Sequence, residues 1–257
     1  MATGITFDSN SLQTSSILTA NIEHESISEK DAKLYAMAHA NSSKIPFVSY
    51  PSRKIKVSGK IIGSGVSNLD SLLDTFRSYF RGQDKNLDID YAGSTRRYIA
   101  TLNGLAIDRP GGLQYANFEA EFVCTQPFGR NTATTSALSA AGRTAAAYVD
   151  LHTFLGTAPY QLPVITITIT AVTGGTGSVV FANSANSQGI TITGQTFVAA
   201  DIIEIDCINK TVKKNGALID FVGAFPEFPP GSQSMTYSDG FTTRTFTISV
   251  TYYPMYL

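Results

Sequence analysis

Tryptophan is absent from this 257-residue sequence, and charged residues make up only 15% of it. The lack of Trp weighs against a sugar-stacking lectin face, although 12 Tyr and 15 Phe residues could take that role. With 43% hydrophobic residues the chain can fold, but its polar surface must depend on Ser, Thr, Asn and Gln. A formal net charge of -1 gives no electrostatic basis for binding nucleic acid or an anionic membrane, so we expect neither as a partner.

Cysteine and long apolar runs are also scarce. The two cysteines, Cys124 and Cys207, lack metal-ligand spacing and are too few for a disulfide framework, so we expect buried small hydrophobes. No apolar run is long enough for a membrane helix. The N-terminal MATGITFDSNS has neither the basic nor the apolar region of a signal peptide, which predicts folding in a reducing cytoplasm.

The N-terminal half predicts an α+β domain over residues 1–130. Period-2 alternation marks strands at 54–62, 86–93, 96–107 and 118–124, with 86–93 and 96–107 forming a hairpin and Gly59 marking a bulge. An apolar stripe predicts a helix over 67–82, capped by Ser67 or Asn68 and ended by Gly82. Residues 28–40 are a weaker helical candidate.

The C-terminal half, residues 131–257, predicts an antiparallel β-sandwich. Residues 164–172, VITITITAV, alternate isoleucine with threonine, and 202–221 predict three short strands joined by two turns. Residues 242–257 predict a long final strand. The Ala-, Thr- and Ser-rich stretch at 131–157 lacks strong periodicity, so we expect a linker or an extended excursion there.

Catalytic and cofactor signals are weak. Gly63 and Gly65 fit the first two positions of a dinucleotide-binding loop, but Asn68 occupies the third and no parallel βαβ context follows. The acid pairs Asp88/Asp90 and Glu119/Glu121 alternate with apolar residues, which is typical of the wet face of a strand. Such pairs could serve a glycosidase only at a separation of about 5–10 Å. We expect no enzyme, no cofactor and no catalytic residue.

No metal site is predicted either. Glu23 and Glu25 share one face of an extended segment while His24 points to the other, so the three cannot chelate together. A solvated strand is the simpler interpretation. His39 and His152 have no carboxylate or cysteine at ligand spacing.

The stretch IIEIDCINKTVKKNGALIDF, residues 202–221, has the clearest turn signal. Asn215 and Gly216 between two strands favour a type I′ turn, in which both central residues have positive φ. Lys213 and Lys214 then lie on a short strand, where lysines commonly protect an edge. Asn209 begins a sequon, NKT, that simply makes a turn here.

Taken together, the two halves resemble the distal tail protein (Dit) family of long-tailed bacteriophages. In the N-terminal half the resemblance rests on KVSGKII, LDSLLDTFRSYFRG, LDIDYAGSTRRYIATLNGL and FEAEFVCTQPFG, which ends at Pro127 and Phe128. In the C-terminal half it rests on GTAPYQLPVITITI, the meander above, FPEFPPGSQSMTYS and FTISVTYYPMYL.

The resemblance implies a structural virion protein of the tail tip or baseplate, made in the host bacterial cytoplasm. Its N-terminal domains would form a homohexameric ring that joins the tail tube to the tail-tip and receptor-binding baseplate proteins. Its galectin-like C-terminal domain would project outward and contact other baseplate components.

A carbohydrate-binding module or adhesin is the alternative, because galectin-like sandwiches often hold sugars. It requires exposed aromatic side chains on one sheet face, for which Tyr237, Phe241, Tyr252 and Tyr253 are the candidates. Their place in alternating strands favours core or rim packing instead. Cell-surface carbohydrate therefore stays open as a partner.

Overall fold

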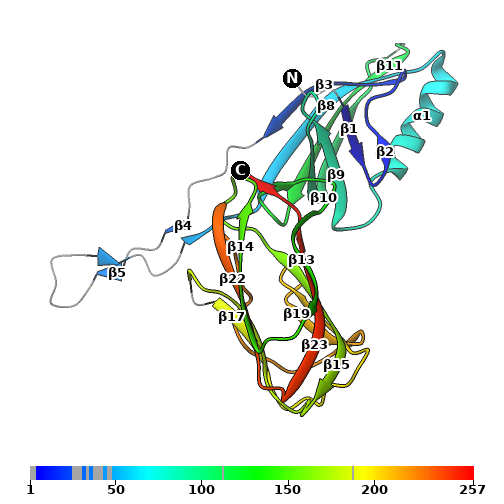
Figure 1. Cartoon of the computed structure of the whole chain (residues 1–257). Helices are drawn as coiled ribbons and strands as arrows, with labels where there is room; N and C mark the ends of the chain where they lie inside the picture. Colours follow the sequence, from blue (N-terminus) through cyan, green and yellow to red (C-terminus); the bar gives the residue numbers. More distant parts are fainter. Residues whose placement is uncertain are drawn as a thin grey trace. The chain divides into compact units, whose positions relative to one another are not determined.

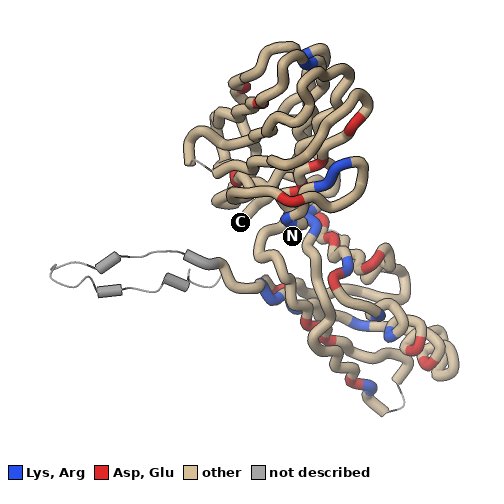
Figure 2. The backbone as a smooth tube through the Cα atoms, turned by 90° about the horizontal axis from the view of Figure 1, so that it is seen from below, with Lys and Arg blue, Asp and Glu red and all other residues tan. Residues whose placement is uncertain are grey.

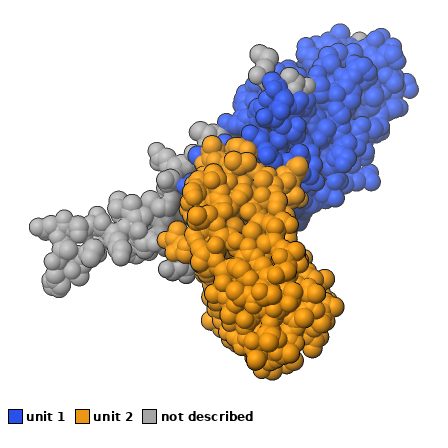
Figure 3. All heavy atoms as spheres, in the orientation of Figure 1, with its two compact units in different colours: residues 1–132, 257 blue, residues 133–256 orange. Residues whose placement is uncertain are grey.

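The computed structural model describes residues 4–24, 31–32, 35–36, 43–44, 48–111, 113–186 and 188–257. The chain divides into two compact units, residues 1–132 with 257 and residues 133–256, which we call the N-terminal and C-terminal units (Figure 3). The protein is mainly β, with antiparallel sheets and a single helix in the part described, which confirms the expected class (Figure 1).

One antiparallel sheet organises the N-terminal unit. Its strands follow the order β2-β1-β9-β10-β11-β8-β3. They are β1 (Gly4–Phe7), β2 (Asn10–Ser11), β3 (Ile17–His24), β8 (Arg53–Ile62), β9 (Lys85–Asp90), β10 (Thr95–Asp108) and β11 (Tyr115–Cys124), and β12 (Gly129–Arg130) pairs with β10. The predicted hairpin is confirmed, because β9 and β10 pair directly.

Between β3 and β8 in the sequence the structure describes two further strand pairs, each a separate two-stranded sheet. β4 (Asp31–Ala32) pairs with β7 (Val48–Ser49), and β5 (Tyr35–Ala36) pairs with β6 (Ser43–Lys44). The weaker helical candidate at 28–40 lies largely outside the described residues, and its described parts, β4 and β5, are extended.

The helix α1 (Val66–Ser78) supplies the cover for one face of this sheet. Leu69, Leu73 and Phe76 are its buried residues, and the Phe76 ring lies 4.8 Å from Phe118 of β11. The helix is shorter than predicted. It starts after an extended Gly65 with no side-chain cap, because the Asn68 side chain accepts a hydrogen bond from the Ser64 N–H instead.

The bulge predicted at Gly59 lies instead on the neighbouring strand β3, opposite Gly59. The register between β3 and β8 shifts between Thr19 and Asn21, which leaves Ala20 as the extra residue. A Cβ atom on Gly59 would lie 2.2 Å from the Leu18 carbonyl oxygen. Glycine is therefore required for β3 to approach so closely.

Two antiparallel sheets form the C-terminal unit. One has the order β13-β23-β15-β18-β19-β20 and the other β14-β22-β16-β17-β21. Their strands are β13 (Thr135–Arg143), β14 (Ala147–Phe154), β15 (Pro163–Thr173), β16 (Val179–Asn183), β17 (Gln188–Ile192), β18 (Ile202–Asp206), β19 (Thr211–Lys214), β20 (Ala217–Leu218), β21 (Val222–Gly223), β22 (Gly231–Asp239) and β23 (Thr243–Tyr252); β24 (Met255–Tyr256) follows.

Side-chain alternation explains how the two sheets pack. Ile165, Ile167 and Ile169 of β15 point into the core while the threonines between them point out. Aromatic rings meet between the sheets, with Tyr237 of β22 lying 4.4 Å from Phe246 of β23. The meander at 202–221 has the three predicted strands, because β18 pairs with β19 and β19 with β20.

The stretch at 131–157, expected as a linker or excursion, instead forms two strands. β13 pairs with β23 and β14 pairs with β22, each at the edge of its sheet. Small Ala, Ser and Thr side chains give little hydrophobic alternation, and an edge strand needs little of it. The pairing comes from β22 and β23, about a hundred residues further along the chain, so local pattern could not show it.

We expect Phe76→Ala to destabilise the N-terminal unit by about 3–5 kcal/mol, because it leaves a cavity between α1 and the sheet. Urea unfolding followed by far-UV circular dichroism measures this. Thr75→Ala changes an exposed position of the same helix and should shift stability by no more than about 0.5 kcal/mol. Equal effects of the two variants would refute the proposed packing.

Candidate interaction surfaces

Three of the four aromatic candidates for sugar contact are core residues. Tyr237, Phe241 and Tyr252 are all nearly fully buried. The Tyr237 hydroxyl donates to Asp239, and the Tyr252 hydroxyl accepts the Leu155 N–H at 2.8 Å. Tyr253 is half-buried. A sugar ring needs an open aromatic face, so Tyr237, Phe241 and Tyr252 cannot provide one.

The Asn215-Gly216 turn is anchored to the interior. The two residues have φ values of 51° and 83°, which a type I′ turn requires. The Asn215 side chain donates to Asp201 at 2.7 Å and accepts the Ile202 N–H at 2.8 Å. The turn therefore carries a structural role beyond reversing the chain.

Lys214 belongs to this anchor, whereas the sequence suggested a solvated lysine. Its ammonium lies 3.1 Å from the Asp201 carboxylate and 2.6 Å from the Thr196 carbonyl oxygen. Burial opposes ionisation of Asp201, but hydrogen bonds from Val198 and Asn215, together with Lys214, hold its pKa below the ordinary value. Lys213 differs, because its partner Glu204 is on the open face of the sheet.

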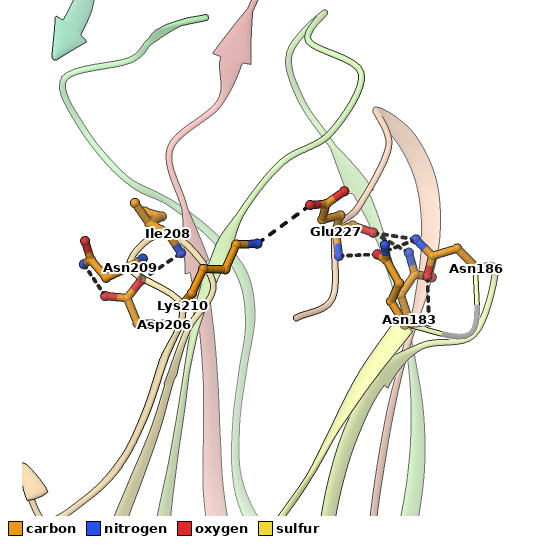
Figure 4. A network of polar contacts seen from close by, with 8 residues as sticks. Asn183, Asn186, Asp206, Ile208, Asn209, Lys210 and Glu227 are labelled. Carbon is orange, nitrogen blue, oxygen red and sulfur yellow. Dashed lines mark hydrogen bonds and ion pairs between the residues drawn. The ribbon is translucent and has the colours of Figure 1, made fainter. Parts of the chain in front are cut away.

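A polar network ties the loops at one end of the C-terminal unit (Figure 4). The Asp206 carboxylate accepts the N–H groups of Ile208 and Asn209, which fixes the β18–β19 turn. Buried Asn183 donates to the Glu227 carbonyl oxygen at 2.8 Å, and Lys210 lies 3.7 Å from the Glu227 carboxylate. These groups satisfy one another, so the network holds the loops in place.

One acid of each pair in the N-terminal unit, Asp88 or Glu121, has a structural role. Asp88 makes a two-point contact with Arg97, at 2.7 Å for each bond. Glu121 lies within 4 Å of both Lys54 and Lys56. Its hydrogen bond from Asn103, assisted by the two lysines, keeps the pKa of Glu121 low. Both signs of charge are thus interleaved across the outer face of this sheet.

A shallow depression of about 400 Å³ lies at the β3 bulge. Ala20, Gly59 and Ala106 leave it open because their side chains are small, and Lys60, Asp108 and Glu119 line its sides. The glycine-rich loop nearby holds α1 closely, since a Cβ on Gly63 would lie 2.8 Å from the Leu69 nitrogen. That close contact gives the loop a packing role and leaves no cradle for a nucleotide.

His24 forms a polar cluster that the sequence did not indicate. Its Nε2 lies 2.5 Å from the Tyr91 hydroxyl, and buried Arg53 lies near Tyr98 with Nη1 3.4 Å from the hydroxyl oxygen. Burial, aided by the Arg53 charge, lowers the pKa of His24. The contact joins β3 to the end of β9, residues that are 67 apart in sequence, so strand alternation alone could not reveal it.

The C-terminal unit carries little charge outside residues 201–227 (Figure 2). The charged residues of 133–200 and 228–256 are Arg143, Asp150, Asp239 and Arg244. They form two ion pairs, Arg143 with Asp150 at 2.6 Å and Arg244 with Asp239 at 2.9 Å, and all four side chains are mostly buried. The outward residues of β14, β16 and β22 are therefore small, apolar or hydroxyl-bearing.

The described part of the chain has neither a metal-ligand cluster nor a membrane-spanning helix. Its His, Cys, Asp and Glu residues form no group of three or more that could hold a metal ion. Within the same residues, no helix has both the length and the apolar character to cross a membrane.

The comparisons with known proteins identify the C-terminal unit. Residues 155–256 match the family described as "Siphovirus-type tail component, C-terminal domain". Most of that unit is therefore similar to a tail-component domain of siphoviruses. No curated protein matches the sequence.

Among solved structures, the chain is similar to the SPP1 Dit (gp 19.1) protein, called a paradigm of hub adsorption apparatus in phages that infect Gram-positive hosts. The identity is 14%, the TM-score is 0.68, and 99% of each chain is covered. Two structures of the phage p2 baseplate in its activated conformation, with Sr and with Ca, match at 8% identity and TM-scores of 0.47 and 0.44, covering 96% and 90% of each chain. The resemblance to distal tail proteins is confirmed: the chain has the fold of SPP1 Dit.

We expect Asp201→Ala to destabilise the C-terminal unit by about 2–3 kcal/mol, because Lys214 and Asn215 lose a buried charged partner. Chemical denaturation measures the change. Glu204→Ala removes the exposed partner of Lys213 in the same meander and should cost at most about 1 kcal/mol. If Glu204→Ala proves the more damaging variant, the assignment of the anchor is wrong.

Acidification should weaken the N-terminal unit as the pH falls below about 6.5. The folded state holds the pKa of His24 below its ordinary value of 6.5, so the unfolded chain binds more protons in that window. Hydrogen exchange of β8 and β11 peptides between pH 7.5 and 5, corrected for the intrinsic exchange rate, measures this loss. His24→Gln should reduce the pH dependence, and an unchanged dependence in that variant would contradict the role of His24.

Proposed function

We propose that this chain is a structural hub subunit of a phage baseplate. The N-terminal units form a six-membered ring that joins the tail tube to the tail-tip and receptor-binding proteins. The C-terminal units contact other baseplate components and support host attachment. The subunit is made in the host bacterial cytoplasm and functions in the virion.

The observation that carries this proposal is the family match over residues 155–256, a tail-component domain. The fold is similar to that of a hub protein over 99% of the chain, so the similarity also includes the N-terminal unit. A ring needs a repeated contact between different surfaces of neighbouring copies, and a broad sheet with an open edge at β3 offers such surfaces.

A non-enzymatic role fits the chemistry of the described residues. One acid of each pair singled out by the sequence is engaged in ion pairs, Asp88 with Arg97 and Glu121 with Lys54 and Lys56. The half-buried His24 bonds to a tyrosine that burial keeps protonated, because it raises the pKa of Tyr91. These contacts stabilise strands and leave no activated nucleophile or acid–base pair among them.

Sugar binding through the four aromatic residues is not part of the proposal. Three of them fill the core between the two sheets, so their loss would unfold the unit before it revealed a ligand. Binding of cell-surface carbohydrate would have to use Tyr253 or another surface of the C-terminal unit.

Electron microscopy of the purified full-length protein tests the proposal. We expect projections with six-fold symmetry and a central channel, and a native mass that is six subunits of 27.5 kDa or a multiple of six. A protein that stays monomeric at high concentration, or a ring of another symmetry, would overturn the ring.

A further inference from the structure

The edge strand β14 lacks most of the features that normally keep sheet edges from pairing. Its eight residues pair with β22 without a register shift. The other three edges of the C-terminal sheets are poor templates by comparison. β13 has two register shifts, and β20 and β21 are two residues long. Of these four described edges, β14 alone is both long and regular.

The backbone of β14 presents alternate donors and acceptors to the open side. The Ala146 carbonyl oxygen accepts the Asp239 N–H from the β22 side at 2.9 Å. The backbone N–H and C=O groups of successive residues point to opposite sides of a strand. Those of the even-numbered residues therefore point to β22. Those of Ala147, Val149, Leu151 and Thr153 point to the open side, in the plane of the sheet. The next odd residue, Leu155, fits this pattern, since its N–H donates to the Tyr252 hydroxyl.

The side chains of the strand are equally unprotected. Val149 and Leu151 are 69% and 77% exposed, and neither a lysine nor a proline lies on the strand. The one charged residue, Asp150, points inward to Arg143. Monomeric proteins usually place lysine, proline, a bulge or an unpaired inward charge on such an edge to prevent association. Here the inward charge of Asp150 is balanced by Arg143, and lysine, proline and a bulge are absent from β14, so the edge stays able to pair with another strand.

We propose that β14 pairs antiparallel with β14 of a second copy, about a two-fold axis at Leu151. Leu151 then faces Leu151 of the other copy, and Val149 faces Thr153. These are residues whose backbone groups point outward, so each such pair can exchange both of its hydrogen bonds.

Avoidance of like charges selects this register over the neighbouring one. With the axis at Leu151, Asp150 of each copy faces His152 of the other. The Nε2 of His152 is buried and has no hydrogen-bond partner among the described residues. An axis one residue earlier would set the two Asp150 carboxylates opposite each other, and like charges directly opposite are destabilising. The residues of β14 in a second copy thus fit the open edge of β14 in this register.

The inference rests on the proposed function only for the six-membered ring in which the β14 contact would occur. In a six-membered ring, one such contact per subunit joins two rings face to face through their C-terminal units. The ring contact and the β14 contact are separate surfaces, so either can fail alone.

Cysteine trapping in the full-length protein tests the register. Under mild oxidation, Leu151→Cys should form a disulfide between copies, because directly opposite residues have Cα atoms about 5.5 Å apart. Val149→Cys alone should not, since its own copy lies four residues away, about 13 Å along the strand. The native Cys124 and Cys207 are fully buried and do not compete. Equal trapping at both positions, or none at Leu151→Cys, would overturn the register.

Native mass tests the contact itself. Leu151→Lys sets two lysines opposite each other at the axis, and Leu151→Pro removes an outward donor without touching the β22 ladder. Each should halve the mass of the wild-type assembly. Leu218→Lys is the control, because Leu218 is 72% exposed on the two-residue β20, and it should leave the mass unchanged.

The outcomes separate this inference from the ring. Wild-type dimers that become monomers in Leu151→Lys support the β14 contact and refute the ring. Single six-membered rings in both proteins refute the β14 contact and leave the ring intact. A mass that falls equally in Leu218→Lys shows that the loss is not specific to β14 and refutes the contact.

Discussion

The pairing of β15 with β23 is the interaction on which the rest of the C-terminal unit depends. It joins Pro163 to Tyr252 at one end and Thr173 to Thr243 at the other. β23 also pairs with β13, and β15 with β18, so the six-stranded sheet is assembled outward from this pair. Because the partners are about 70 to 90 residues apart, the chain must close a long loop before this sheet gains its hydrogen bonds.

The local sequence pattern was sufficient to predict an element where a single segment has its own hydrophobic periodicity. The alternation of Ile and Thr in β15 and the apolar stripe of α1 each follow from a single stretch of sequence, and both elements are present, although α1 ends earlier than predicted and lacks the predicted cap. The Asn215-Gly216 turn was equally local, since positive φ at both residues is a property of the dipeptide itself. Periodicity and turn chemistry therefore predicted these elements.

Contacts between distant segments could not be predicted in this way. The strand β14 has weak alternation and owes its place to β22, and the His24 contact depends on Tyr91 from another strand. Lys214 was predicted to be solvated because no nearby residue in sequence marks Asp201 as its partner. The buried aromatic residues Tyr237 and Tyr252 needed the second sheet to show that their rings face inward.

The two thiols described among the core residues have a consequence for the chemistry of the protein. Burial raises the pKa of Cys124 to about 12 and raises that of Cys207 as well. The thiolate is the form that reacts with oxidants and disulfides, and neither residue forms it to a useful extent at neutral pH. While the protein stays folded, Cys124 and Cys207 are therefore protected from disulfide exchange in both reducing and oxidising media.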